Sequence, residues 1–168
     1  MKKLFIILAA CVFVWGCAKK QTVKPQPIEP KLTAPVEQAA PPAEEPSVRY
    51  ADWQPLPQIA TVFFNYDQSD LMPSAREALK KNAEFIKGNP NLEVLVGGHC
   101  DERGTFEYNL ALGQRRAAVV REYYGQLGVP LGRIATISYG EEMPANPGQN
   151  EAAWAKNRRA ETKIRTKK

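Results

Sequence analysis

The pattern of hydrophobic and polar positions along the chain predicts helices packed on a β-sheet. Strands are indicated where β-branched, aliphatic and aromatic residues form short runs, at residues 60–66, 92–98, 134–140 and 161–166. Helices are indicated where apolar residues recur three or four positions apart, at residues 72–90, 105–128 and 150–160. Strands and helices that alternate in this way are typical of an α/β fold.

The N-terminal end has the pattern of a bacterial lipoprotein signal. Lys2 and Lys3 precede an uncharged apolar run over residues 4–15, which is too short to be a permanent membrane span. The run ends in "VWGC", which resembles a lipobox, where the cysteine is diacylated and becomes the new N-terminus. We therefore expect a signal peptide over residues 1–16 and lipid attachment at Cys17.

The residue after Cys17 bears on localisation. In similar lipoproteins of Gram-negative bacteria, an aspartate at that position signals retention in the inner membrane, and here the position holds Ala18. The resemblance implies a lipid-anchored protein of the outer membrane whose domain faces the periplasm. Several acyl chains anchor a protein far more firmly than one, since each buried methylene adds about 0.8 kcal/mol.

Residues 17–57 have the composition of a spacer. Seven prolines lie in the stretch "KPQPIEPKLTAPVEQAAPPAEEPS", which offers little apolar surface to bury. Such a segment is expected to be a disordered tether with polyproline II character, reaching about 100 Å when extended. A globular domain is expected over residues 58–168. A role for the prolines in partner recognition stays open.

Charge and cysteine content narrow the classes of function. The net charge of +5 falls to +3 when the two signal-peptide lysines are removed, which does not indicate a nucleic-acid-binding protein. Cys11 leaves with the signal peptide and Cys17 is expected to carry lipid, so Cys100 has no partner for an intrachain disulfide.

The stretch "GGHCDERGTFEYNLALGQRRA" carries the densest chemistry, at residues 97–117. His99 and Cys100 are neighbours on a predicted strand, so their side chains point to opposite faces and do not form a catalytic pair. Cys100 is expected to be a small buried residue on the face of Val94 and Val96. Consecutive ligand-type residues cannot converge on a metal, and the adjacent acids Asp101 and Glu102 diverge. We expect no enzyme activity, no metal and no cofactor.

A helical wheel of residues 105–128 distinguishes the two adjacent arginines. Arg116 lies within about 25° of the centre of the predicted apolar stripe and Arg115 near its edge. The stripe is formed by Tyr108, Leu112, Val119, Val120, Tyr123 and Leu127. A buried arginine needs an acceptor, which either Asp101 or a ligand carboxylate would supply. From spacing alone, a structural Asp101–Arg116 ion pair is as good an interpretation as a ligand site.

Three motifs carry a family resemblance. "GHCDERGTFEYNLALGQRRA", "ISYGEEMP" and "NEAAWAKNRRA" resemble, in this order, the peptidoglycan-associated lipoprotein family of the Tol–Pal system, whose C-terminal domain is OmpA-like. The resemblance covers about residues 59–165 and implies an α/β sandwich with a mixed sheet. It also implies noncovalent binding of the peptide stem of peptidoglycan, usually through meso-diaminopimelate.

The resemblance also implies which residues bind. Asp101 and Arg116 would hold the zwitterionic end of diaminopimelate, the carboxylate meeting its ammonium and the guanidinium its carboxylate. The remaining residues implied at the site are Asn109, Leu110, Arg103, Thr105 and Asp67. Gly104 is expected to permit a turn. Asn157 and Arg158 are interpreted as structural.

The function that the resemblance implies is a link between the outer membrane and the cell wall. It would support envelope integrity and cell division, with peptidoglycan, TolB and TolA as partners. Two alternatives stay open: another OmpA-like peptidoglycan-binding lipoprotein outside Tol–Pal, and a periplasmic wall hydrolase. The hydrolase is disfavoured because no catalytic constellation is found.

Overall fold

A computed structural model of the chain describes residues 46, 48 and 52–167. The predicted signal peptide, Cys17 and most of the predicted tether lie outside these residues. In the described part of the chain, no helix has the length and apolar character needed to cross a membrane. The elements, in chain order, are β1 (Gln54–Pro55), β2 (Val62–Phe63), α1 (Pro73–Gly88), β3 (Leu92–His99), α2 (Phe106–Gln126), a 3-10 turn (Leu131–Arg133), β4 (Ile134–Gly140), α3 (Glu151–Asn157) and β5 (Arg159–Thr166).

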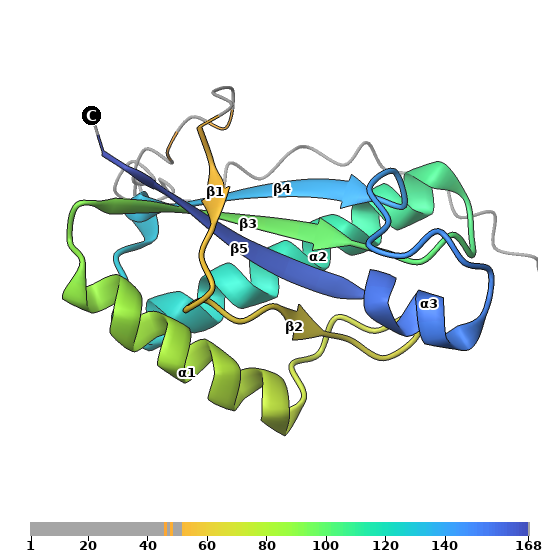
Figure 1. Ribbon diagram of the computed structural model, residues 1–168, viewed down its shortest axis with the longest axis horizontal. Coiled ribbons are helices and arrows are strands. Elements are labelled where there is room, and N and C mark those ends of the chain that lie inside the picture. The colour runs from red at the N-terminus through yellow and green to blue at the C-terminus, as the bar shows by residue number, and fades with distance from the viewer. Residues whose placement is uncertain (1–45, 47, 49–51, 168) are drawn as a thin grey trace, which may run out of the picture. The chain divides into compact units, whose positions relative to one another are not determined.

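The predicted fold class, helices on a mixed sheet, is confirmed (Figure 1). The strand order is β1-β5-β3-β4, and β2 also pairs with β5. β3 and β4 run parallel, whereas β5 runs antiparallel to β3, β1 and β2. α1 and α2 pack their apolar sides against one face of the sheet, where residues such as Leu79, Val96 and Val120 form the core.

The first and last strands differ from their predicted bounds. β2 covers two residues rather than 60–66, because after Phe64 the backbone groups bond to arginine side chains and not to a neighbouring strand. β1 lies inside the segment expected to be a tether, and its Pro55 is tolerated because an edge strand need not donate at every residue. β5 begins at Arg159, before the predicted start at residue 161.

The predicted core stripe of α2 is partly wrong. Tyr108 is 44% exposed, and its hydroxyl donates to Asp67 at the surface. The buried side of the helix is rotated relative to the predicted stripe, and consists of Asn109, Leu112, Gly113, Arg116, Ala117, Val120 and Tyr124. The reason is that the first turn of α2 packs on a loop and not on the core. Arg116 is buried, as the wheel predicted, and Arg115, which the wheel placed near the edge of the stripe, is exposed.

Two glycines bring β3 and α2 into close contact. A Cβ placed on Gly98 would lie 1.9 Å from the carbonyl oxygen of Gly113, a distance at which backbone atoms would have to move. The helix can therefore approach the end of β3 only because neither position carries a side chain. This contact fixes Arg116, one turn after Gly113, close to the residues that follow β3.

Candidate functional site

A pocket of about 100 Å³ lies where the loop after β3 meets the segment after β2 and the start of β5. It is smaller than the pockets that hold drug-sized ligands, and suits a small charged group. Its lining residues are Tyr66, Asp67, Cys100, Asp101, Arg103, Gly104, Tyr108, Asn109, Leu112, Arg116 and Arg158. Three arginines face two aspartates, so the lining carries an excess of positive charge.

Arg116 reaches the pocket from inside the fold. Its guanidinium donates to the backbone oxygens of Gln68 at 2.9 Å, His99 at 2.8 Å and Asn65 at 3.2 Å. A fourth contact, at 3.4 Å, is to Sγ of Cys100. Within the described residues no ion pair joins Arg116 to Asp101, so the structural pair considered from the sequence is not formed. The positive charge of Arg116 is held by carbonyl dipoles, which leaves it able to attract an anion.

Asp101 is 4% exposed and is held by two other arginines. Arg103 forks onto its carboxylate, with Nε 3.2 Å from Oδ1 and a terminal nitrogen 2.7 Å from Oδ2. Arg158 donates to Oδ2 at 3.1 Å. Burial by itself would raise the pKa of the Asp101 carboxyl, but the hydrogen bonds from Arg103 and Arg158 outweigh it and hold the pKa below its usual value. Asp101 is therefore ionised.

Arg103 lies between two aromatic rings. Its guanidinium carbon is 3.9 Å from the centre of the Tyr66 ring and 4.2 Å from that of Trp154. The indole Nε1 of Trp154 donates to Glu102, which comes just before Arg103 on the same loop. The two rings keep the guanidinium in a plane beside Asp101 while leaving it 30% exposed.

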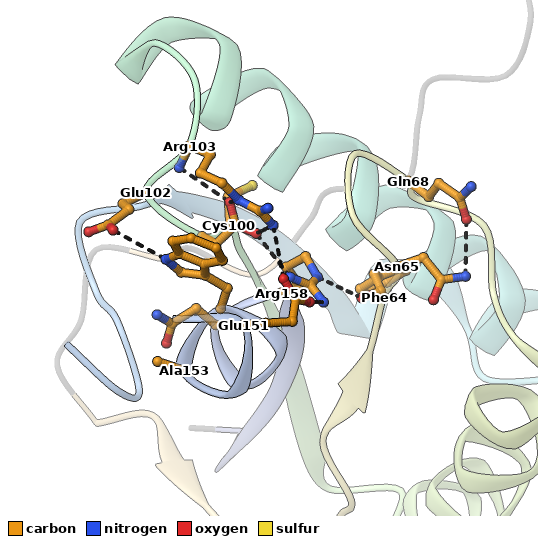
Figure 2. A network of polar contacts seen from close by, with 12 residues as sticks. Phe64, Asn65, Gln68, Cys100, Glu102, Arg103, Glu151, Ala153 and Arg158 are labelled. Atoms are coloured by element: carbon orange, nitrogen blue, oxygen red, sulfur yellow. Dashed lines mark hydrogen bonds and ion pairs between the residues drawn. The ribbon is translucent and has the colours of Figure 1, made fainter. Parts of the chain in front are cut away.

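Arg158 is a pocket residue that the sequence analysis interpreted as structural. In Figure 2, polar contacts lead from Arg158 to Phe64 and to Glu151. Arg158 donates to the carbonyl of Phe64 at 3.2 Å and to Glu151 at 2.7 Å. It therefore ties three segments together and also forms the inner wall beside Asp101. The signal that could have identified it was the "NRRA" motif. The side-chain amide of its neighbour Asn157 bonds to the backbone N–H and carbonyl of Asn146.

Asn109 and Thr105 shape the loop of residues 100–105. The Asn109 amide donates to the backbone oxygens of Asp101 and Arg103 and, at 2.6 Å, to Glu141. Thr105 is the N-cap of α2, where its hydroxyl accepts from the backbone of Tyr108. Gly104 has φ of 118°, which confirms that it permits the turn.

The other two predicted site residues lie on different sides of α2. Asp67 is on the pocket rim, has φ of 55° and accepts from Tyr108. Leu110 is outside the pocket and lines a separate groove between α2 and β4, together with Thr136 and Ser138. The pocket thus brings together Asp101, Arg116, Asn109, Arg103 and Asp67 of the predicted set, but not Leu110 or Thr105. The binding role of each stays a prediction.

His99 and Cys100 occupy separate environments. The His99 ring stacks on Tyr139 of β4, with centroids 4.9 Å apart. Cys100 is buried, as predicted, and its thiol donates to the backbone oxygen of Asn109. Burial raises the pKa of this thiol, which disfavours the reactive thiolate. In the residues described here, no group of three or more His, Cys, Asp and Glu side chains is placed to hold a metal ion.

Comparison with known proteins gives matches over the same region. The model of the OmpA family matches residues 63–158. A peptidoglycan-associated lipoprotein of Haemophilus influenzae is 49% identical over 100 residues, which are 60% of this chain and 65% of the relative. One from Pseudomonas aeruginosa is 46% identical over 113 residues, 67% of each chain. The matched region thus spans about two thirds of the length of these relatives.

Solved structures share the fold. The peptidoglycan-associated lipoprotein of Burkholderia pseudomallei has a TM-score of 0.61 at 40% identity, and the match covers 62% of this chain and 89% of that one. The C-terminal domain of MotB from Helicobacter pylori also has a TM-score of 0.61, but at 24% identity. That match covers 64% of this chain and 85% of the MotB chain. The MotB likeness bears on the fold alone.

Proposed function

Because the chain belongs to the OmpA family, we propose that its domain binds the peptide stem of peptidoglycan noncovalently. The proposed ligand group is the zwitterionic end of a diaminopimelate residue. Relatives that are 46–49% identical carry the name peptidoglycan-associated lipoprotein, which supports this choice of ligand.

One observation carries the proposal: a buried guanidinium that has no carboxylate partner among the described residues lies in the same small pocket as an ionised carboxylate. Arg116 presents positive charge and Asp101 negative charge, both on the pocket wall. A ligand end that carries an ammonium and a carboxylate matches this arrangement. A neutral group would leave the charge of Arg116 without an anionic partner. The pocket is also too small to enclose a whole glycan unit.

The wider role follows from the same relationship. We infer that the protein is a lipoprotein anchored in the outer membrane through Cys17, with the domain on the periplasmic side. It would link that membrane to the cell wall within the Tol–Pal system, with TolB and TolA as partners. The second candidate is an OmpA-like wall-binding lipoprotein that works outside Tol–Pal. Cys17 itself lies outside the described residues, and labelled palmitate that enters wild type and Cys17→Ser equally would refute the anchor.

Binding without catalysis is the proposed activity. Asp101 is held by arginines, Asp67 accepts from Tyr108, and the thiol of Cys100 is buried. Among the described residues, none of these three groups is paired with a general base. Incubation of the full chain with purified sacculi distinguishes a wall-binding protein from a wall hydrolase. A binder pellets with the sacculi and releases no soluble fragments. Release of soluble wall fragments would instead identify a hydrolase.

The residue-level test uses Asp101→Asn, which keeps the shape of the side chain and removes its charge. We expect sacculus pull-down to be lost, because an amide cannot hold an ammonium between the pocket walls. Asp70→Asn is the matched control, since Asp70 is exposed and lies outside the pocket. Pull-down by Asp101→Asn at the level of the control would refute the assignment.

A further inference from the structure

The carboxylate of Asp101 is fully occupied in the free protein. Its Oδ1 accepts from both the backbone N–H and Nε of Arg103, at 3.2 Å each. Its Oδ2 accepts from a terminal nitrogen of Arg103 at 2.7 Å and from Arg158 at 3.1 Å. An ionised carboxylate offers about four acceptor positions, and all of them are in use. An arriving ammonium can therefore bond to Asp101 only if one of these donors leaves.

The two arginines differ in how easily they can leave. The side chain of Arg158 is 8% exposed and is also bound to the Phe64 carbonyl and to Glu151, so its displacement would break contacts between three segments. The side chain of Arg103 is 30% exposed and comes from a surface loop. Apart from Asp101, its partners are two ring faces and a 3.8 Å contact with Glu151. Ring faces do not fix a guanidinium at one position, so Arg103 can slide between them and keep its contact with both.

We propose that Arg103 is an internal competitor for the ligand: it occupies Asp101 in the free protein, and the ammonium of the ligand displaces it while Arg158 stays in place. This inference rests on the proposed function, since it names how the same pocket selects its ligand. The exchange replaces one cation by another, so a ligand whose amine is acylated cannot drive it. Arg103 thus makes binding depend on a charged amine.

The test is a calorimetric titration of the full chain, purified in detergent, with a tripeptide that ends in diaminopimelate. The variant is Arg103→Gln, whose planar amide still fits between Tyr66 and Trp154 but carries no charge with which to compete for Asp101. We expect Arg103→Gln to bind the peptide about five- to tenfold more tightly, the factor that corresponds to the loss of one partly exposed charged pair. Lys80→Gln is the control, because it removes the same charge from an exposed residue of α1. The control should bind like wild type.

A second ligand makes the test specific to the amine. The same tripeptide with its side-chain amine acetylated should bind poorly to wild type and should gain nothing from Arg103→Gln. Weaker or unchanged binding of the free-amine peptide by Arg103→Gln would overturn the inference, because it would make Arg103 a ligand contact or a bystander. If wild type does not bind the free-amine peptide at all, the proposed function fails instead.

A direct observation of Arg103 does not depend on the variant. In the free protein, its Nε–H donates to Asp101 and should give a distinct ¹⁵N-resolved resonance. Addition of the free-amine peptide should shift that resonance. The Nε–H of Arg158 should keep its hydrogen bond to the Phe64 carbonyl, so its resonance should move little. A resonance of Arg103 that is unchanged at saturating peptide would refute the exchange.

Discussion

Protonation of His99 offers a clean test of the packing at the end of β3. His99 is the only histidine in the sequence, and it is 1% exposed. Neither ring nitrogen has a hydrogen-bond partner among the described residues. Burial is the main reason that the pKa of His99 is lowered, to about 4, and the charge of Arg159 adds to it. Glu161, with Oε2 3.9 Å from Nε2 of His99, raises this pKa. Lys163 of the same strand lowers it, as Arg159 does.

The size of the effect follows from the difference in pKa between the two states. An unfolded histidine titrates near 6.5, so the difference is about 2.5 pKa units, or about 3 kcal/mol at 1.36 kcal/mol per unit. Because the unfolded chain binds the proton first, the free energy of unfolding should fall as the pH is lowered from about 6.5 to about 4. The pKa of Glu161 is lowered in the fold, so protonation of this carboxylate lowers the free energy of unfolding further at the acid end of this range.

The assay is urea unfolding of the full chain at several pH values, with His99→Phe as the reference. Phenylalanine can keep the stack on Tyr139 and has no proton to bind. We expect wild type to lose about 3 kcal/mol more than His99→Phe between pH 7 and pH 4. The single imidazole signal in a proton spectrum should titrate well below 6.5. Parallel stability curves for the two proteins, or an imidazole that titrates near 6.5, would refute this account of the buried ring.

Two further predictions concern the contacts that place the pocket. In denaturant titrations, Gly98→Ala should lower the free energy of unfolding by about 3 kcal/mol, because the added methyl group meets the Gly113 carbonyl. Gly88→Ala is the control: a Cβ there has no atom within 4 Å, so the free energy of unfolding should change by less than about 1 kcal/mol. A tolerated Gly98→Ala would mean that β3 and α2 are not in close contact. Arg116→Lys should lower the free energy of unfolding by about 2–4 kcal/mol and abolish sacculus binding, because the single nitrogen of lysine cannot reach carbonyls that are bonded by three different nitrogens of the guanidinium. The exposed Arg115→Lys should change neither quantity. Equal melting temperatures for the two lysine variants would contradict this role of Arg116.

Local periodicity was enough to predict most of the fold and the inward direction of Arg116. The helices and the long strands have apolar spacings that determine their type, and the wheel separates Arg116 from Arg115 without any tertiary information. The error at Tyr108 has a physical origin. A wheel assumes that one stripe packs on one surface along the whole helix, whereas the first turn of α2 packs on a loop and leaves Tyr108 free to bond Asp67.

The partners of Asp101 could not be found from spacing. Arg103 is two residues away, but its position depends on Tyr66 and Trp154, which come from distant parts of the chain. Arg158 is 57 residues from Asp101, and they meet because β5 pairs with β3. The sequence therefore singled out Asp101 and Arg116, and left open whether they pair with each other or hold a ligand. In the fold they do not pair with each other, since Asp101 is bound by Arg103 and Arg158, and Arg116 by backbone oxygens.

The short strands at the N-terminal side of the domain have a mechanical consequence. β1 and β2 each pair with β5 over only two residues, so a pull on the chain before Gln54 would peel them away bond by bond. Asn82 holds Ala60 through two hydrogen bonds between these strands. The next anchors after β2 are Arg158, which holds Phe64, and Arg116, which holds Asn65 and Gln68. These anchors are the two buried arginines of the pocket. Tension on the chain would therefore reach the proposed binding pocket directly, and a ligand bound against Arg116, as we propose, would raise the force that the domain withstands before it opens.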